Sequence, residues 1–246
     1  MKYSDLLRDE LSLKEAEDLQ LKYVNFLKDY EPDLLTEEEE KEITWIAGVD
    51  VSYFELNGKE WGVACAILWN FAKNQLEEYK TALSLIRFPY QAGFLGFREC
   101  KVLAEAIEKL SRRPEVILCD GHGVIHPRRF GEAVQLGVAL DIPSCGVAKN
   151  PFVGYSDWET LSRKKGNKVP IWSERPDPEN PQKADLLGYA VSLNDEMKPV
   201  FTSPGYRTTP KLAVNLALKT TFSHRQPEPL FLSDKFSRHE AKKWTS

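Results

Sequence analysis

The N-terminal part of the chain combines the hydrophobic spacing of a helix with a polar segment that follows it. Apolar residues recur at helical intervals across residues 12–30, and Ser12 stands where a helix cap is expected. Residues 31–42 are polar and contain an acidic cluster, Glu37 to Glu40. The pattern therefore predicts a helix over residues 12–30 and a solvated connector over residues 31–42.

Long apolar runs begin at Ile43 and predict consecutive strands, which cover residues 43–54, 61–71 and 76–88. Asn57-Gly58 separates the first two runs, and this dipeptide between apolar runs is typical of a tight β-hairpin. Residues 87–94 contain proline and glycine, so we expect a loop there. The core therefore opens with an antiparallel, three-stranded arrangement.

The remaining chain alternates between helical and extended patterns. Helices are predicted over residues 94–111 and 128–141, and strands over residues 114–120, 142–149, 186–193 and 199–205. Pro210, with Thr208 or Thr209 as the cap, begins a helix over residues 210–222, which we expect to be the last one. Residues 150–186 are expected to be loop-like. Their basic run is typical of a solvated face, with phosphate contacts as the alternative, and consists of Arg163, Lys164, Lys165 and Lys168.

This order of elements predicts an α/β fold with a mixed sheet flanked by helices. The antiparallel start with an acidic first strand suggests a ribonuclease H-like fold. No internal repeat or low-complexity tract divides the chain, so we expect one domain over residues 1–246. It would consist of an N-terminal helix and acidic linker over residues 1–42 and a catalytic core over residues 43–235.

Composition narrows the function class without defining it. Hydrophobic residues make up 42% of the chain and charged residues 28%, as in an ordinary globular enzyme. The net charge of −4 argues against a protein that coats nucleic acid electrostatically, although a local basic groove is compatible with it.

The cysteines and the N-terminus bear on the cellular setting. None of the four cysteines forms a C-x-x-C pair, so we expect free core thiols, no zinc site and a reduced, cytoplasmic setting. The N-terminus lacks an apolar core of the signal-peptide kind, and no apolar run is long enough to cross a bilayer. Neither a membrane partner nor an obligate protein partner is expected.

Asp50 is an acidic residue inside the apolar run of the first predicted strand. Alternate residues of a strand share a face, so Asp50 shares its face with Gly48 and Ser52, whose small size leaves room above the carboxylate. Burying a carboxylate is costly unless it is paired or binds a metal. The alternative interpretation is an aspartate that caps a turn at the strand end.

Glu99 lies on the apolar side of a predicted helix. It is in line with Leu95, Leu103, Ala106 and Leu110, so it should face the sheet rather than solvent. The alternative interpretation is a salt bridge to a buried cation.

Asp120 ends a short apolar strand and precedes a Gly-His-Gly turn. Ligands of open α/β sheets bind beyond the carboxyl ends of strands, although a turn aspartate would fit the same position. Asp50, Glu99 and Asp120 together would form a hard-oxygen site suited to Mg²⁺, with Mn²⁺ as a substitute. Such sites serve phosphoryl chemistry.

Several motifs strongly resemble those of the endonuclease V family. They are AGVDVSYF, FRE, LCDGHGVIHPRRFG, GVAK, SPG and PEP, and the resemblance extends from about residue 13 to about residue 235. The family has a ribonuclease H-like fold and cleaves DNA near deoxyinosine, and some members cleave at inosine in RNA. The resemblance therefore implies a DNA-repair hydrolase that cuts on the 3′ side of a deaminated base and leaves 3′-hydroxyl and 5′-phosphate ends.

The resemblance also implies roles for individual residues. Asp50 and Asp120 would be the principal metal ligands and Glu99 the third acidic residue. His126 would lie next to the metal centre, and Lys149 near the scissile phosphate; taken alone, either could be an ordinary loop or strand-end residue. Asp234 is a weak candidate near the metal.

Lesion recognition is implied for the loop after the third strand. Pro89 and Tyr90 stand where the family has its Pro-Tyr-Ile-Pro wedge, but Gln91 and Ala92 replace the second half. The remaining candidates for contacts with the base or phosphates are Gly93, Leu95, Gly121, Gly123, Arg128 and Arg129. The family often has histidine where Gln135 and Tyr206 stand.

Two other function classes compete with a metal-dependent endonuclease. A catalytically weak inosine or nucleic-acid binding protein of the same fold would retain the pocket but not the cleavage. An unrelated nucleotide-binding enzyme is disfavoured because the chain contains neither a G-x-G-x-x-G motif nor a P-loop.

Overall fold

The structure is a computed structural model that describes residues 3–29 and 33–245, and the remaining parts of the expected linker and domain lie outside the described residues. Its strands are β1 (Trp45–Leu56), β2 (Lys59–Asn70), β3 (Gln75–Leu85), β4 (Val116–Cys119), β5 (Ser144–Ala148), β6 (Lys168–Trp172), β7 (Leu186–Val191) and β8 (Val200–Pro204). Its α-helices are α1 (Leu13–Asp29), α2 (Leu95–Ile107), α3 (Glu132–Leu140), α4 (Pro210–Lys219) and α5 (Glu228–Lys242). Short 3₁₀ helices are η1 (Ser4–Leu7), η2 (Glu40–Glu42), η3 (Trp158–Thr160) and η4 (Pro181–Lys183).

Within the described ranges the strands form one eight-stranded mixed sheet in the order β3-β2-β1-β4-β5-β8-β7-β6. The opening three strands are antiparallel, as predicted, and Asn57 and Gly58 both have positive φ at the hairpin turn. β4 then pairs parallel to β1, and β5 parallel to β4. The predicted α/β class and ribonuclease H-like mixed sheet are confirmed.

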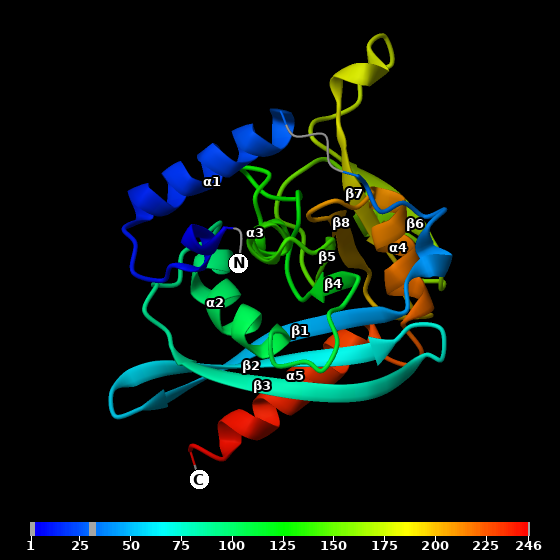
Figure 1. Cartoon of the computed structure of the whole chain (residues 1–246). Coiled ribbons are helices and arrows are strands. Elements are labelled where there is room, and N and C mark those ends of the chain that lie inside the picture. The colour runs from blue at the N-terminus through cyan, green and yellow to red at the C-terminus, as the bar shows by residue number, and fades with distance from the viewer. Residues whose placement is uncertain (1–2, 30–32, 246) are drawn as a thin grey trace.

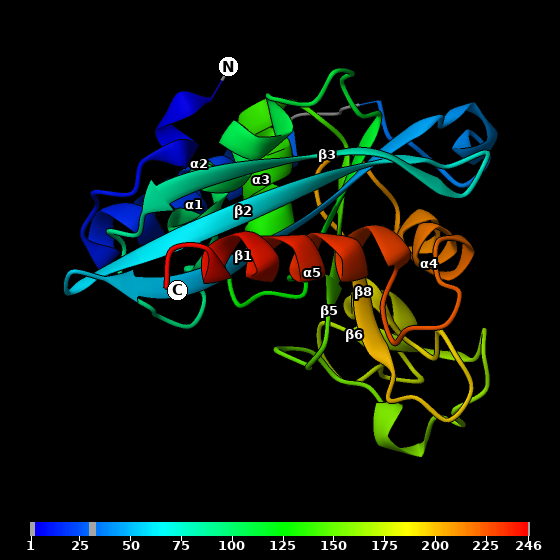
Figure 2. The same ribbon diagram turned by 90° about the horizontal axis from the view of Figure 1, so that it is seen from below.

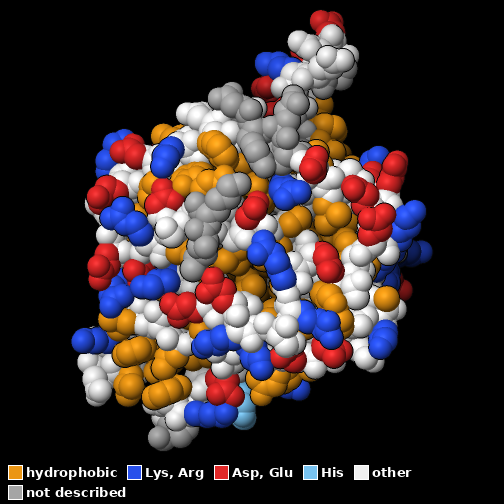
Figure 3. Space-filling view, in the orientation of Figure 1, with side chains coloured by type: hydrophobic (Ala, Val, Ile, Leu, Met, Phe, Trp, Pro, Cys, Tyr) orange, Lys and Arg blue, Asp and Glu red, His pale blue; other side chains and the backbone are white. Residues whose placement is uncertain are grey.

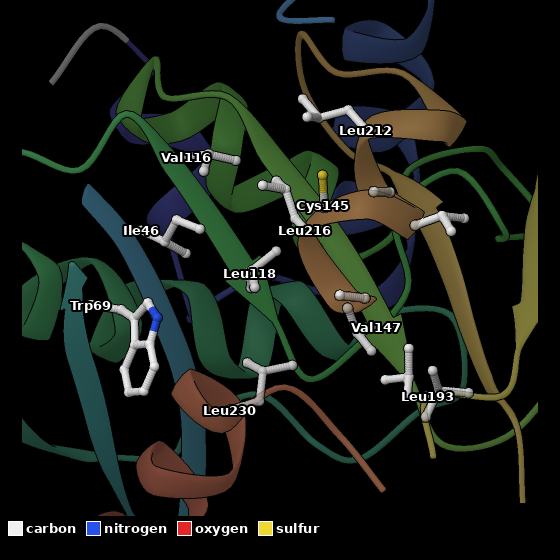
Figure 4. Close-up of a cluster of buried hydrophobic side chains, with 14 of the residues drawn as sticks. Ile46, Trp69, Val116, Leu118, Cys145, Val147, Leu193, Leu212, Leu216 and Leu230 are labelled. Atoms are coloured by element: carbon white, nitrogen blue, oxygen red, sulfur yellow. The ribbon is translucent and has the colours of Figure 1, made fainter. Parts of the chain in front are cut away.

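Helices cover both faces of the sheet (Figures 1 and 2). One core lies between α2, α3 and the side of β1 that carries Val49 and Val51. The other core lies on the opposite face against α4 and α5, and Figure 4 shows Ile46, Leu118 and Leu230 within it. Different helices bury the two faces. Because successive strand residues point to opposite faces, odd- and even-numbered residues of β1 pack against different helices.

The N-terminal helix begins as the sequence predicts. Ser12 Oγ accepts a hydrogen bond from the Glu15 backbone N–H, and the Glu15 carboxylate accepts from the Ser12 backbone N–H. This reciprocal pair is a capping box. α1 packs through Ala16 and Leu19 against phenylalanines of the α2 region and through Tyr23 against Phe130.

The acidic connector is exposed over most of its described length, as predicted, but two of its glutamates are engaged by the protein. Glu40 is buried, where its carboxylate accepts hydrogen bonds from Lys219 and Asn215 of α4. Glu37 accepts from Thr209. The expectation was wrong for these two residues because cationic and polar partners far along the chain were not visible in local charge patterning.

The C-terminal part of the chain differs from the prediction in one important element. The helix predicted over residues 210–222 is α4, capped by Thr209, but α5 follows it and was missed. Pro227 and Pro229 resemble helix breakers, yet they fall at the N-cap and in the first turn, where a missing N–H is tolerated. α5 fills the room that Gly48 and Ser52 leave on their face of β1: Ser52 Oγ lies 2.7 Å from Ser237 Oγ.

The segment over residues 150–186 also contains more structure than expected. β6 lies within it and pairs antiparallel with β7. Pro170 argues against a strand in a sequence pattern, but β6 is the last strand of the sheet, and proline is tolerated on an edge. The basic run Arg163, Lys164, Lys165 and Lys168 is exposed, in agreement with a solvated face.

The surface seen in Figure 3 carries acidic and basic side chains interspersed with one another. This mixture fits the net charge of −4. Recognition of a charged polymer through this face would therefore depend on local groups rather than on one broad field.

We predict that Gly48→Ala destabilises the protein by disturbing the contact between β1 and α5. A Cβ at this position would lie 2.4 Å from Pro229 Cβ and 2.5 Å from its carbonyl carbon. Forcing an additional methyl group into a packed contact costs about 1–3 kcal/mol. Urea unfolding measures the loss.

Ser52→Ala is the matched control, because it lies on the same face and removes only the hydroxyl near Ser237. It should cost about 1 kcal/mol or less. An equal or smaller loss for Gly48→Ala would show that the first turn of α5 moves aside freely.

Candidate active site

Asp50 and Asp120 lie side by side because β1 and β4 are paired in parallel. The register pairs Val49 with Cys119, and the residue after each is an aspartate: Asp50 within β1 and Asp120 directly after β4. In-register residues of parallel strands point to the same face. β4 ends there while β1 continues to Leu56, which leaves the edge of β1 open beside Asp50. The strand pairing thus places two carboxylates together at an accessible edge.

These aspartates interact unfavourably with each other and with Glu99. Burial, followed by the charges of Asp120 and Glu99, holds the pKa of Asp50 well above its ordinary value. Burial also raises the pKa of Asp120, although the Lys149 ammonium acts in the opposite direction. The two carboxylates therefore favour a bound proton or a cation between them.

Glu99 reaches the same place from α2, on the buried side of the helix as predicted, and is 7% exposed. Its carboxylate accepts a hydrogen bond from the Tyr53 hydroxyl of β1. Arg98 stacks on the Tyr53 ring but forms its ion pair with Glu60. Burial raises the pKa of Glu99 to about 7. The geometry thus gives Glu99 a tyrosine partner in place of the buried salt bridge that the sequence left open.

Glu132 is a further buried carboxyl group that the sequence analysis missed. It lies at the first position of α3, where burial and then the Glu99 charge hold its pKa well above the ordinary value. Its Oε2 atom packs against Gly121, where a Cβ would come within 2.2 Å, and has no hydrogen-bond partner among the described residues. A glutamate in the first turn of a helix is so common that its position gave no signal.

Lys149 and Arg225 supply positive charge at this site. The Lys149 ammonium donates to the Asp120 carboxylate, and its side chain is 38% exposed. Arg225, which the sequence analysis did not single out, donates from Nη2 to the carbonyl oxygens of Lys149 and Pro199. Arg225 thereby holds the backbone that carries Lys149. No local pattern connects these positions, because they come from separate loops.

Both histidines of the Gly-His-Gly and His-Pro segments are neutral. Burial lowers the pKa of His122 and of His126 to about 4. His126 Nε2 lies 3.0 Å from the carbonyl oxygen of Gly93, so it carries the proton, and its Nδ1 accepts from the backbone N–H groups of Arg128 and Phe130. Both ring nitrogens of His126 are therefore engaged with the backbone.

A cavity of about 420 Å³ opens above the carboxylates. Of the predicted site residues, its lining includes Asp50, Tyr90, Gly93, Leu95, Glu99, Asp120, Gly121, His126 and Lys149. Tyr90 is 77% exposed at the rim, so its ring does not pack into the core. Pro89, beside it, is also exposed.

Other predicted site residues lie elsewhere. Gly123 packs against the carbonyl of Pro204, where a Cβ would come within 2.0 Å, and does not line the cavity. Arg128 contacts Gln20 and the Gly93 carbonyl, and Arg129 Nη1 lies 3.5 Å from the Val124 carbonyl oxygen. Asp234 of α5 pairs with Arg238 and adds negative charge felt by Asp50 and Asp120.

The donor set fits a divalent cation, although no group of three metal-ligating side chains converges in the described parts of the chain. Carboxylate groups from β1, α2, α3 and the residue that follows β4 line one cavity, and Glu132 Oε2 among them has no hydrogen-bond partner in the described residues. Hard oxygen donors of this kind suit Mg²⁺ or Mn²⁺. The four cysteines are free and buried, as expected.

No helix among the described residues is long and apolar enough to cross a membrane.

Comparisons with known proteins point to one family. The family model described as Endonuclease V matches residues 31–235. A curated Endonuclease V of Dictyoglomus turgidum is 37% identical, with 83% of each chain covered. The crystal structure of an Endonuclease V from Streptomyces avermitilis has a TM-score of 0.78 at 29% identity, covering 97% of this chain and 96% of that one.

A further structure is similar over most of its length and contains nucleic acid. It is Ciona intestinalis Endonuclease V in complex with a 24mer DNA containing an inosine followed by a ribo-adenosine. It is 26% identical with a TM-score of 0.78, and 94% of this chain and 98% of that chain are covered.

We predict that Glu99→Gln stabilises the metal-free protein, and that the gain grows as the pH rises. Folding raises the pKa of Glu99 from 4.5 to about 7, so between these values the folded state binds more protons than the unfolded state. Stability due to this group is present below the unfolded pKa and is lost as pH rises through the folded pKa. Glutamine removes that loss. Melting temperatures at about pH 5 and about pH 8, in the presence of a chelator, measure it.

Glu108→Gln, an exposed change at the end of the same helix, controls for general charge effects. Its melting temperature should differ from that of the original protein by the same small amount at both pH values. A Glu99→Gln protein that is less stable than the original at the higher pH would contradict the prediction, by showing that the Tyr53 hydrogen bond to the charged carboxylate outweighs the cost of burying that charge.

Proposed function

The chain belongs to the endonuclease V family and is a hydrolase, and from that premise we propose that it is a metal-dependent endonuclease acting beside a deaminated base. The proposed substrate is DNA containing deoxyinosine, with inosine in RNA as a second substrate. Cleavage would fall on the 3′ side of the base and leave 3′-hydroxyl and 5′-phosphate ends.

One observation carries this proposal: Asp50 of β1 and Asp120, which directly follows β4, line a cavity whose rim holds an exposed tyrosine. Asp50, Asp120 and Glu99 line that cavity together with Lys149. The carboxylates suit a hard cation, and Lys149 suits an anionic backbone group. Tyr90 offers an open aromatic surface to a base.

We propose that Asp50 and Asp120 are the principal metal ligands and that Glu99 is the third, with Mg²⁺ as the cofactor and Mn²⁺ as a substitute. A divalent cation bound there would polarise the phosphodiester and lower the pKa of a bound water. Tyr53 fixes the Glu99 carboxylate by its hydrogen bond, so this oxygen donor needs little reorganisation when a cation binds.

The basic groups contribute by neutralising charge at the scissile phosphate. Lys149, paired with Asp120 and partly exposed, can turn its ammonium toward a phosphate oxygen at the cavity mouth. Arg225 holds the Lys149 backbone in place while its own charge lies near Asp120. His126 is neutral with both ring nitrogens engaged, so its proposed role is to position the loop at Gly93 rather than to transfer a proton.

The cavity can receive an extruded base. Its volume of about 420 Å³ lies within the range typical of small-ligand pockets, roughly 300–1,000 Å³. Gly93 and Gly121 bring backbone close to that space without side chains in the way. Enzymes that act beside a particular base commonly extrude it from the stack.

Cleavage of matched strands carrying deoxyinosine, inosine, uracil or an abasic site, with Mg²⁺ present, tests the proposal. Selective cleavage on the 3′ side of the deaminated base would support the proposal. Equal cleavage of plain strands would contradict it. Binding of the same strands in chelator, without cleavage when Mg²⁺ is restored, would instead identify a catalytically weak inosine reader.

We predict that Asp50→Asn and Asp120→Asn each lower the cleavage rate by roughly 100-fold or more while the protein stays folded. Altering groups around a bound metal typically costs 10–100-fold, and a direct ligand should lie at or beyond the upper end. Because each change removes like-charge repulsion, the metal-free variants should melt at or above the original temperature. Single-turnover rates at saturating Mg²⁺ measure the loss.

Asp18→Asn is the control for loss of an aspartate, because Asp18 pairs with Lys14 on the surface of α1. It should cleave at the original rate. Retention of that rate by either Asp50→Asn or Asp120→Asn would refute the ligand assignment.

We predict that Tyr90→Ala weakens binding to inosine-containing strands by roughly tenfold or more, because base–aromatic stacking contributes about 1–3 kcal/mol. Binding to plain duplex should change much less, since phosphate contacts dominate there. Affinities for both strands at one salt concentration measure the effect.

Tyr79→Ala is the matched control, because Tyr79 is an exposed tyrosine of β3 that contacts Phe236 away from the cavity. Its affinities should match those of the original protein. Equal losses on both strands for Tyr90→Ala would mean that the ring does not recognise the lesion.

A further inference from the structure

The carbonyl oxygen of Gly93, at the cavity rim, accepts hydrogen bonds from several side chains. Among the described side chains, Gln20 Nε2 donates to it at 3.0 Å, Arg128 Nη2 at 2.8 Å and His126 Nε2 at 3.0 Å. A carbonyl oxygen has two lone pairs, so these donors saturate it. Gln20 comes from α1, whereas His126 and Arg128 both lie in the turn before α3, far along the chain from Gln20.

Gln20 connects these groups from inside the protein. It is 1% exposed, and its second Nε2 hydrogen bond goes to the Phe130 carbonyl at 3.2 Å. Its Oε1 accepts from Arg128 Nε. A buried amide is costly unless its donors and acceptor are satisfied, and here every bond is made to the same small region. Gln20 therefore fixes Arg128 and Gly93 relative to each other.

Gly93 lies in the loop that precedes α2, where the buried ends of the loop meet its exposed tip. Phe88, Gly93 and Phe94 are buried, whereas residues 89–92 are exposed. Gly93 has φ +84°, and an added Cβ would lie 3.0 Å from Arg128 Nη2. The Arg128 guanidinium also lies over the Phe94 ring, 4.4 Å from its centroid. The base of the loop is thus held from several sides, while its tip is open.

The helix that supplies Gln20 lies outside the segment matched by the family model, which begins at residue 31. α1 packs against the Phe88 and Phe94 base through Ala16 and Leu19. Figure 1 shows α1 on the same side of the sheet as α2 and α3. Its packing brings the helix to the loop, and Gln20 adds the polar contacts that define the loop's position.

We propose that Gln20 is a positioning residue, which acts through Gly93 and Arg128 to hold the 89–92 tip at the cavity mouth. Its effect on lesion binding rests on the proposed function. Its effect on the loop does not. The benefit is preorganisation. When the ends of the loop are fixed, the tip that carries Tyr90 loses less conformational freedom as a nucleobase stacks on it. Gln91 and Ala92 supply no second proline, so the support has to come from outside the tip.

The test compares Gln20→Met, which keeps the side-chain length but removes all three hydrogen bonds, with the original full-length protein. Hydrogen exchange of the free protein should become roughly fivefold or more faster over residues 88–94, in line with losing buried hydrogen bonds, and stay unchanged in β1 and β4. The affinity for a deoxyinosine strand should fall roughly five- to tenfold, while single-turnover cleavage at saturating enzyme stays within about twofold.

Tyr23→Phe is the matched control, because it removes one hydrogen bond of the same helix, from the Tyr23 hydroxyl to Asp5, away from the loop. It should leave exchange over residues 88–94 unchanged. Gln20→Glu serves as the second variant, since it can still accept from Arg128 but cannot donate to Gly93, and it should also speed exchange at the loop.

Unchanged exchange over residues 88–94 in folded Gln20→Met and Gln20→Glu proteins would overturn the proposal. Equal acceleration by Tyr23→Phe would also overturn it, by assigning the effect to helix docking in general. If the original protein binds deoxyinosine and plain strands equally, the proposed function fails, and the exchange measurements still decide the role of Gln20.

Discussion

The parallel pairing of β4 with β1 is the constraint on which the rest of the structure depends. It places Asp50 and Asp120 in register at the point where β4 ends, and thereby forces two carboxylates together. Like charges in a low-dielectric setting raise one another's pKa values and favour a bound cation. Glu99 and Glu132 add to this unfavourable concentration of negative charge. Lys149 offsets part of this repulsion through its ion pair with Asp120.

The two faces of the sheet contribute differently to this site. On one face α2 and α3 deliver Glu99 and Glu132 above the edge of β1. On the other face α5 packs so closely that Gly48 has no room for a side chain, and it brings Asp234 within electrostatic reach of Asp50. Because both helical layers are anchored to β1, the carboxylates are held by the most extensively paired part of the sheet rather than by loops.

The sequence predicted those parts of the molecule whose signals are local. Periodicity and turn chemistry located the opening hairpin and α2, and a glutamate on an apolar helical face was recognisable as anomalous. α5 and β6 were missed because their prolines act as breakers in a pattern but sit at a helix start and on an edge strand. Gln20, Glu132 and Arg225 were missed because each looks ordinary in its own segment and gains meaning only through partners distant in the chain.

The site also separates what must be rigid from what must adapt. Charge stabilisation requires fixed donors; Asp50 and Tyr53 lie on β1, Glu99 lies on α2, and Asp120 directly follows β4. The proposed recognition of an extruded base would require an accessible aromatic surface, and Tyr90 is exposed on a short loop tip next to Gly93, whose carbonyl accepts several hydrogen bonds. His126 belongs to this second system, since its ring nitrogens bridge the Gly93 carbonyl and the backbone that leads into α3. Burial lowers the pKa of His126, and its contacts with two loops agree with the proposed role of positioning the loop at Gly93.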